Sequence, residues 1–330
     1  MAASLSSSVT HISAYAAIDA VIKEEIPVID MSILRNATPN QRPQLIQEIG
    51  QACKEWGCFS LINHGVPESL RTLMMEAFTE FFDLSEEERR EYLGKRILDP
   101  IRHEMGISTT AEGEKYSRDF VRIFVHPAMH SPSKPLHFRA ILEEYARQTR
   151  EIANDLLTAI GESLGLDESY MEKALDLANG HQILVGNRYP PSPQAHQLAL
   201  GLSAHSDTPL LSVVMQNGSI HGLQVMHNGR WIPVQLIPGS FFIHTGDLLE
   251  IVSNGKYKSL LHRVMLDERS TRISVVTAMG PPVENIVAPA PKLVEIVSKN
   301  SVFPSIKYVD YVELVKYNPF GKSVLDLLRI

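Results

Sequence analysis

The feature that most restricts the fold is a run of short β-type segments that begins just after His181. The segments are rich in Val, Ile, Leu and Phe, and turns containing Gly, Pro, Asn or Asp separate them at intervals of roughly 8–12 residues. They read QILVGNRY, LLSVVMQ, GLQVMH, RWIPVQ, GSFFIHTGD, HRVML and RISVVTAM. Short strands at such regular spacing predict an antiparallel barrel or sandwich.

The first half of the chain follows a helical pattern instead. Apolar residues recur at helical spacing in residues 41–56, 67–82 and 141–164. Ser85 and Glu88 have the spacing of a capping box, which predicts one more short helix. IPVID and CFSLINHGV are typical of strands, and VLDLLRI near the end is typical of a closing helix.

Two stretches are less regular. A polar loop with Asn36, Pro39 and Asn40 is expected after IPVID, and residues 94–135 mix short apolar runs with His, Gly and Pro. We therefore expect one α+β unit, mainly β in its second half. Its parts are a flexible leader 1–25, an α-rich region 26–180 packed on the core, a β core 181–285 and a closing segment 286–330.

Composition excludes several functional classes. The net charge is -7 and no block of Lys and Arg stands out, so we expect no nucleic-acid partner. No apolar run approaches the ~20 residues that span a bilayer, and the first twenty residues lack the features of a signal or transit peptide. The two cysteines, Cys53 and Cys58, fit reduced core residues. We expect a cytoplasmic monomer.

His205 and Asp207 in GLSAHSDTPLLS are candidate metal ligands, because residues two apart in a strand project from the same face. His262, separated from Asp207 by 54 residues, lies in another predicted strand and can supply a third ligand. Two histidines and one carboxylate that leave positions open are typical of non-haem Fe(II) oxygenases. A catalytic zinc site is an alternative, although the HExxH helix of common zinc hydrolases is absent. With thirteen histidines in the chain, a chance pair on a surface loop is another.

Four further residues can form a site for a carboxylate beside the metal. Arg272 and Ser274 share one face of a strand, and a guanidinium binds a carboxylate through two hydrogen bonds while a hydroxyl adds a third. Asn187 and Tyr189 alternate in the same way in NRYPPSP, and Tyr189 can donate its hydroxyl to the same ligand. A surface ion pair at Arg272 and a core position for Tyr189 are the structural alternatives.

Many ordered motifs resemble the plant 2-oxoglutarate- and Fe(II)-dependent dioxygenases. The resemblance covers nearly the whole chain: IPVIDM, EWGCFSLINHGVP and FFDLSEEER in the first half, then NRYPPSP, GLSAHSD, GLQVMHNGRWIPV, PGSFFIHTGD, SNGKYKSLLHRV and RISV. It implies a double-stranded β-helix (jelly-roll) core, with iron on His205, Asp207 and His262. It also implies 2-oxoglutarate held by Arg272, Ser274 and Tyr189, with Asn187 alongside.

The resemblance further implies a small-molecule substrate that is hydroxylated, desaturated or O-demethylated by O2, with succinate and CO2 as products and ascorbate as a possible reductant. Such a substrate would lie near the 94–135 segment, where Met105, Phe120 and Phe124, together with Met279, are candidate pocket walls. The chain departs from the usual family pattern at Ser192, Ser206, His244 and Met279, where Cys, Thr, Asn and an aromatic residue are common. His244 can line the site or be a hydrogen-bonded core histidine.

Three other functions stay open at this point. An oxidase of the same fold can use ascorbate or the substrate's own electrons without consuming 2-oxoglutarate. A catalytically silent homologue can bind a small molecule or a partner, and a zinc hydrolase would use the same three ligands. The identity of the substrate is not determined by these residues.

Overall fold

A computed structural model describes residues 25–36, 38, 40–94, 96–110, 113–193, 199–218, 222–297, 300–317 and 323–330. Of the predicted leader, only Glu25 falls in these ranges, so the leader lies outside the described residues. Within this part of the chain, no helix is long and apolar enough to cross a membrane.

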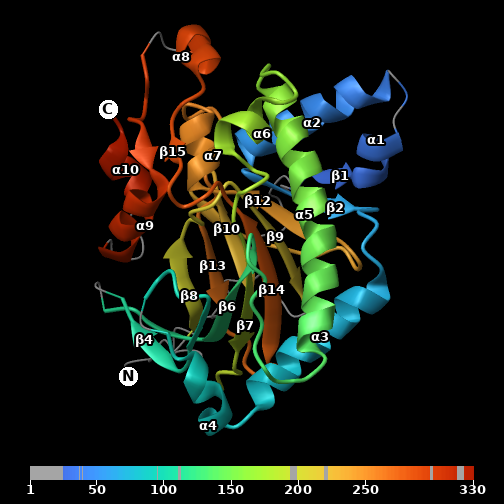
Figure 1. Ribbon diagram of the computed structural model, residues 1–330, viewed down its shortest axis with the longest axis vertical. Helices are drawn as coiled ribbons and strands as arrows, with labels where there is room; N and C mark the ends of the chain where they lie inside the picture. Colours follow the sequence, from blue (N-terminus) through green and yellow to red (C-terminus); the bar gives the residue numbers. More distant parts are fainter. Residues whose placement is uncertain are drawn as a thin grey trace, which may run out of the picture.

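The larger sheet of the described residues has eight strands in the order β1-β2-β12-β9-β14-β7-β6-β3 (Figure 1). Its neighbouring strands are antiparallel, except that β1 is parallel to β2. In that order the bounds are Val28–Asp30, Cys58–Ile62, Phe241–Thr245, Leu211–Gln216, Arg272–Met279, Gln182–Tyr189, Asp119–His126 and Ile101–Glu104.

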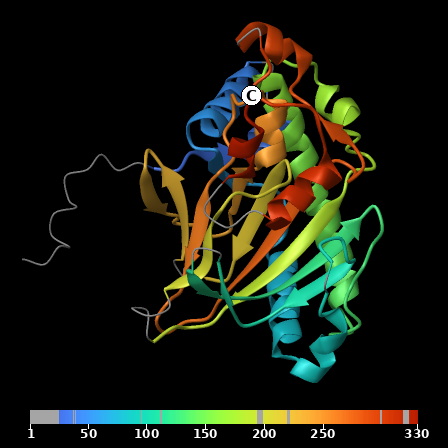
Figure 2. The ribbon, with the colours of Figure 1, turned by 90° about the vertical axis from the view of Figure 1, so that its left-hand side faces the viewer.

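A second sheet, in the order β11-β10-β13-β8-β5-β4, lies on the side of the large sheet away from the long helices (Figure 2). Its strands are Arg230–Pro233, Leu223–His227, His262–Met265, Leu200–His205, Lys115–Ser117 and Ile107–Thr109. An apolar cluster between the sheets contains Val214 and Phe242 of the large sheet and Val225 and Val264 of the small one. The two sheets form the jelly-roll core that the family resemblance implied.

Helices cover the outer face of the large sheet. The long helix α5 (Phe138–Ser163) packs on β7, β9 and β14, with α2 (Gln41–Glu55) and α3 (Glu68–Asp83) beside it (Figure 1). The remaining elements are α1 (Met31–Asn36), α4 (Glu86–Arg89), the 3-10 helix η1 (Arg90–Tyr92), α6 (Tyr170–Leu175), α7 (Asp247–Val252), β15 (Ile286–Val287), α8 (Pro291–Val297), β16 (Ile306–Lys307), α9 (Tyr308–Tyr317) and α10 (Val324–Leu328).

The central strands of the large sheet are therefore buried on both faces, and their side chains alternate between two environments. Along β14, Val275 and Met279 belong to the main apolar core that also contains the helices. Ser274 and Ala278 point the other way and line a cavity between the sheets. Alternation thus places functional groups in the cavity without interrupting the core.

The three predicted helices and the capping box are confirmed. Ser85 Oγ accepts a hydrogen bond from the Glu88 amide at 3.3 Å, and the Glu88 carboxylate accepts one from the Ser85 amide at 3.1 Å. The cysteines are free and buried, as expected. The closing helix is α10.

One expectation for the first half was wrong, and the structure defines a segment that the sequence left irregular. The predicted polar loop after IPVID begins with helix α1, because the Asp30 carboxylate accepts a hydrogen bond from the Ser32 amide at 2.9 Å and caps the helix. The mixed 94–135 segment contains four strands, of which β6 and β3 extend the large sheet past β7. Since β2 pairs with β12 and β6 with β7, the sheet runs without a break across the predicted boundary at residue 181.

Gly246 brings the loop that carries Asp207 close to the start of α7. The Asp247 amide donates to the Asp207 carbonyl at 2.8 Å, and the Gly246 amide donates to the Leu210 carbonyl at 3.1 Å. A Cβ at position 246 would clash with the Pro209 carbonyl oxygen and lie 2.7 Å from that of Asp207. Only glycine fits between these two backbone segments.

We predict that Gly246→Ala lowers the free energy of unfolding by about 1–3 kcal/mol, since the added methyl must displace backbone. It should also weaken metal binding at Asp207, measured by Fe(II) titration. Gly218→Ala is the control, because its Cβ meets no heavy atom within 4 Å and only its φ of 53° is unfavourable. Unchanged stability and iron affinity in Gly246→Ala would contradict the prediction.

Candidate metal centre

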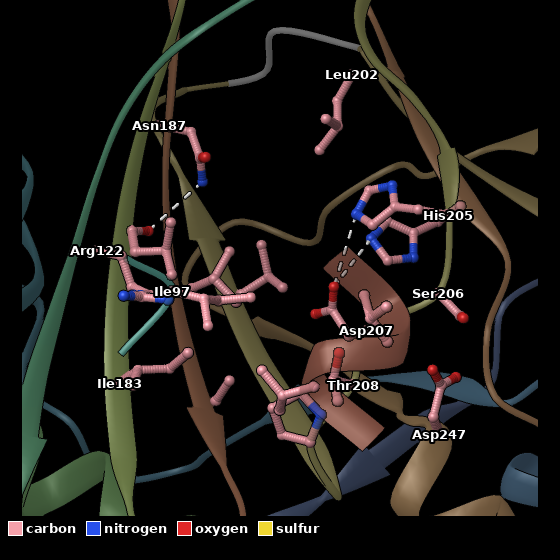
Figure 3. A pocket seen from close by; sticks show the side chains of 18 of the residues that line it. Ile97, Arg122, Ile183, Asn187, Leu202, His205, Ser206, Asp207, Thr208 and Asp247 are labelled. Atoms are coloured by element: carbon pink, nitrogen blue, oxygen red, sulfur yellow. Dashed lines mark hydrogen bonds and ion pairs between the residues drawn. The ribbon is translucent and has the colours of Figure 1, made fainter. Parts of the chain in front are cut away.

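His205, Asp207 and His262 converge in the cavity, and Figure 3 shows His205 and Asp207 facing each other. His205 ends β8 and His262 begins β13, and the two residues are direct partners in the ladder between these strands. Asp207 Oδ1 lies 3.6 Å from His205 Nε2 and 3.8 Å from His262 Nε2. Two ligands at about 2.1 Å from one ion can be at most about 4.2 Å apart, so both distances fit a shared metal.

The histidine rings are fixed in the tautomer that a metal needs. His205 Nδ1 donates to the Ser203 carbonyl at 2.8 Å, and His262 Nδ1 donates to the Leu260 carbonyl at 3.0 Å. Each Nε2 therefore keeps its lone pair and faces Asp207. Burial, and then the nearby His262, lowers the pKa of His205 to about 3, which keeps its ring neutral and able to bind an ion.

The two carboxylate oxygens of Asp207 have different roles. Oδ1 faces the two histidines, whereas Oδ2 accepts a 2.6 Å hydrogen bond from Ser212 Oγ and lies 3.5 Å from His244 Nε2. Ser212 and His244 are cross-strand partners on β9 and β12, which aims both side chains at the same oxygen. The sequence left two positions open for His244, in the lining of the site or in the core. The structure places it in the lining of the site.

Asp207 stays ionised despite its position. Burial by itself raises the pKa of this carboxyl, but His244, His262, His205 and the Ser212 hydroxyl outweigh burial and hold the pKa below its usual range. Burial also lowers the pKa of His244 to about 4. The cluster therefore holds one carboxylate beside imidazoles, of which burial keeps those of His205 and His244 neutral, and this donor set is suited to a divalent cation.

The four residues predicted to hold a carboxylate form two cross-strand pairs. Arg272 of β14 faces Tyr189 of β7, and Ser274 faces Asn187. The Arg272 guanidinium lies 5.2 Å from the Tyr189 ring centroid and 3.4 Å from Ser274 Oγ, and the Asn187 amide donates to Ser274 Oγ at 3.4 Å. The strand register thus brings all four together.

Only 3% of the surface of Arg272 is exposed, and this burial lowers the pKa of its guanidinium. Its Nε donates to Gln216 Oε1 at 2.8 Å, and within the described part of the chain no carboxylate lies within ion-pair distance of it. A buried cation without a counter-charge is costly, so the site fits an anionic ligand.

The cavity between the sheets has a volume of about 510 Å³ and includes both groups of residues. Of the predicted pocket walls, Phe124 lines it. Met105 is half-buried outside the lining, and Phe120 is 8% exposed beneath arginine side chains. Met279 is wrong as a pocket wall, because it lies on the core-facing side of β14, whereas Ala278 lines the cavity.

Several site residues were missed from the sequence. Ser212 and Gln216 support Asp207 and Arg272, and Arg122 of β6, a strand that was not predicted, lines the cavity with Arg118, which immediately precedes it. The spacing of residues 212 and 216 indicates a shared face in a strand. It does not indicate whether that face borders the cavity or the helices, so no local signal identified Ser212 and Gln216.

Two family models match the chain. The 2OG-Fe(II) oxygenase superfamily matches residues 180–281, and the non-haem dioxygenase in morphine synthesis N-terminal model matches residues 26–143. Among known relatives, 2-oxoglutarate-dependent dioxygenase 19 of Oryza sativa subsp. japonica is 42% identical over 321 residues, covering 96% of this chain and 95% of the relative. The chain belongs to the 2-oxoglutarate- and Fe(II)-dependent dioxygenases.

Other members of this dioxygenase family are similar over most of their length. Oxoglutarate-dependent flavonoid 7-O-demethylase 1 of Ocimum basilicum is 33% identical and covers 93% of this chain and 82% of its own. A solved structure of JOX2 in complex with 2OG, Fe and JA is 27% identical, has a TM-score of 0.82 and covers 92% of this chain and 89% of its own. This dioxygenase is thus an oxidoreductase of a family that uses Fe(II) and 2-oxoglutarate.

We predict that Ser212→Ala lowers the affinity of the dioxygenase for Fe(II) by roughly 10- to 100-fold, the usual effect of losing a hydrogen bond to a metal ligand. The hydroxyl holds Asp207 Oδ2, so its loss frees the carboxylate to rotate away from the histidines. Anaerobic iron titration measures the affinity. Ser203→Ala is a matched control at a serine on β8 whose hydroxyl makes no hydrogen bond to a described residue. Equal affinity in Ser212→Ala and Ser203→Ala would contradict this role.

A second prediction concerns His181, whose pKa burial lowers to about 4 and whose Nδ1 donates to the Pro281 carbonyl at 2.7 Å. Below pH 6.5 the unfolded chain binds a proton at this ring that the folded protein does not bind until about pH 4. The free energy of unfolding should therefore fall as pH decreases across this window, by at most about 1.4 kcal/mol per pH unit from this residue.

Urea unfolding of His181→Gln between pH 7 and pH 4 should show a shallower pH slope than the wild type. His137→Gln, at a side chain that is 50% exposed, controls for the loss of one histidine. A slope as steep in His181→Gln as in the wild type would show that another group causes the pH dependence.

Proposed function

We propose that this dioxygenase oxidises a small plant metabolite or hormone, by hydroxylation, desaturation or O-demethylation, and couples this to the conversion of 2-oxoglutarate to succinate and CO2. His205, Asp207 and His262 would hold Fe(II). Arg272 and Ser274 would hold the distal carboxylate of 2-oxoglutarate, with Tyr189 and Asn187 alongside. Bound there, the metal and 2-oxoglutarate supply the activation of O2.

The observation that carries this proposal is the buried guanidinium of Arg272 in the same cavity as the three metal ligands. A metal site alone is equally compatible with a zinc hydrolase. A buried cation that faces no carboxylate of the described chain, next to two hydroxyl donors, calls for a second anionic ligand in the same cavity. A short dicarboxylate can bind Arg272 through one carboxylate and the metal through its other end, so one ligand would occupy both parts of the site.

The chain's own residues have three tasks in this reaction. The histidines and Asp207 fix the ligand positions of the metal, Ser212 and His244 hold the outer oxygen of Asp207, and the walls of the cavity exclude water. The active unit of the proposed enzyme is a monomer. The two free buried cysteines fit a reducing compartment such as the cytoplasm.

Succinate formation with O2 uptake is the decisive measurement. We predict that His205→Ala abolishes both Fe(II) binding and succinate formation. Arg272→Met should keep iron but raise the KM for 2-oxoglutarate by roughly 10- to 100-fold, because a hydrogen-bonded charge pair is lost. Arg263→Met is the control, since Arg263 packs over Trp231 outside the cavity lining.

Each rival function gives a different result. O2 consumed without succinate would show the oxidase that does not use 2-oxoglutarate, and a biological effect that survives His205→Ala would show a binding protein. Zinc in protein purified without oxygen, with no iron-dependent turnover, would show a hydrolase. An unchanged KM in Arg272→Met would remove Arg272 from the 2-oxoglutarate site.

A further inference from the structure

Three arginines line the wall of the cavity that the N-terminal half contributes: Arg102 of β3, Arg118 immediately before β6, and Arg122 within β6. Arg102 and Arg122 are direct cross-strand partners. Like charges directly opposite each other destabilise a sheet. The protein thus places two cations side by side on this wall of the cavity.

Each of these guanidinium groups makes a cation–π contact with an aromatic ring. The guanidinium carbons of Arg118 and Arg102 lie 4.4 and 5.6 Å from the centroid of the Phe120 ring, and that of Arg122 lies 5.2 Å from the Phe124 centroid. Cation–π contacts of this kind hold a guanidinium plane in place without consuming its hydrogen-bond donors. The side chains are therefore positioned, yet still able to bind a ligand.

Among the described residues, only one of the three arginines has an acidic partner. Arg102 forms an ion pair with Glu104. Arg118 donates to Asn187 Oδ1 at 3.2 Å and Arg122 to the Asp99 carbonyl at 3.2 Å, both neutral acceptors, and the structure gives neither an ion pair with a described residue. The Nε atoms of all three are buried without a hydrogen bond in the described chain.

Other charges in the cavity do not neutralise this wall. Asp207 is the metal ligand, and Asp247 accepts a 2.7 Å hydrogen bond from the Tyr311 hydroxyl while burial raises its pKa to about 6. With Fe(II) and 2-oxoglutarate bound, the metal, Asp207, Arg272 and the two carboxylates balance one another. Arg118 and Arg122 then remain as excess positive charge. Burial and the neighbouring Arg102 lower the pKa of Arg122 to about 10, so it is still protonated at neutral pH.

The surroundings of the two arginines are apolar. Ile97, Leu98, Ile183 and Val185 line the same part of the cavity. Figure 3 shows Arg122, with Ile97 and Ile183 beside it, across the cavity from His205 and Asp207. A ligand that bridges the two sides would have an anionic end at the arginines, a hydrocarbon body, and its reacting carbon toward the metal.

We propose that Arg122 binds a carboxylate of the substrate, with Arg118 adding positive charge on the same wall, and that the substrate class of this dioxygenase is an apolar organic monocarboxylic acid. The inference rests on the proposed function for the location of the reacting end. It goes beyond that function in assigning two residues to the primary substrate. A guanidinium whose Nε has no hydrogen bond within the described chain favours a carboxylate over a neutral ester, because an ester offers no charge and fewer acceptors.

The test compares binding of matched acids and esters. Wild-type protein loaded with Mn(II) and saturating 2-oxoglutarate is mixed with a pool of cinnamic, naphthoic and monocyclic terpenoid acids, or with a pool of their methyl esters. Thermal stabilisation identifies the ligands, and calorimetry gives each Kd. We expect acids to bind at least about 10-fold more tightly than their esters.

Arg122→Gln should weaken acid binding by roughly 10- to 100-fold and leave the Kd of esters within about 3-fold. Arg122→Lys should recover part of the loss, because the charge returns without the two-pronged geometry. Arg139→Gln is the control, at a helix arginine that is 57% exposed and paired with Glu143, and it should bind acids as the wild type does.

An equal response to acids and esters, including no response to either, would overturn the proposal, and so would acid binding that Arg122→Gln does not change. Stabilisation by 2-oxoglutarate, measured in the same samples, separates this result from a failure of the proposed function. If 2-oxoglutarate stabilises the wild type but acids bind no more tightly than their methyl esters, only the proposed substrate class is wrong. If 2-oxoglutarate has no effect, the proposed function is wrong.

Discussion

The double burial of the central strands in the large sheet is the constraint on which the rest of the structure depends. One face of β7, β9 and β14 packs on helices and is mainly apolar, with Gln182 hydrogen-bonded to the Ala146 carbonyl of α5, and the other borders a cavity between the sheets. Polar groups on that second face are costly unless something binds them. The strand register then places Arg272 beside Tyr189 and Ser274 beside Asn187, with Gln216 supporting the guanidinium from β9.

The metal ligands depend on the same arrangement from the other sheet. His205 and His262 are neighbours on β8 and β13, and backbone carbonyls fix the orientation of both rings. Asp207 comes from the loop after β8 and is held by Ser212 and His244 of the large sheet. The metal site is therefore shared between the sheets, and its rigidity depends on how the two sheets pack.

The N-terminal half contributes more than a supporting layer. β6 and β3 continue the large sheet past β7 and form the wall opposite the metal ligands. The residues proposed to hold the metal and 2-oxoglutarate thus come from the second half of the chain, whereas the arginines proposed to bind the substrate come from the first.

The sequence by itself determined the features that depend on local spacing. Helical periodicity defined three long helices, alternation placed Arg272 with Ser274 and Asn187 with Tyr189, and the ordered motifs identified the family and predicted a ligand set. Only the tertiary structure decided which face of each strand meets the cavity. That choice depends on partners far away in the sequence, so Met279 was assigned to the wrong side and Ser212, Gln216, Arg118 and Arg122 were missed. Periodicity fixes which residues share a face, and only sheet packing decides what that face contacts.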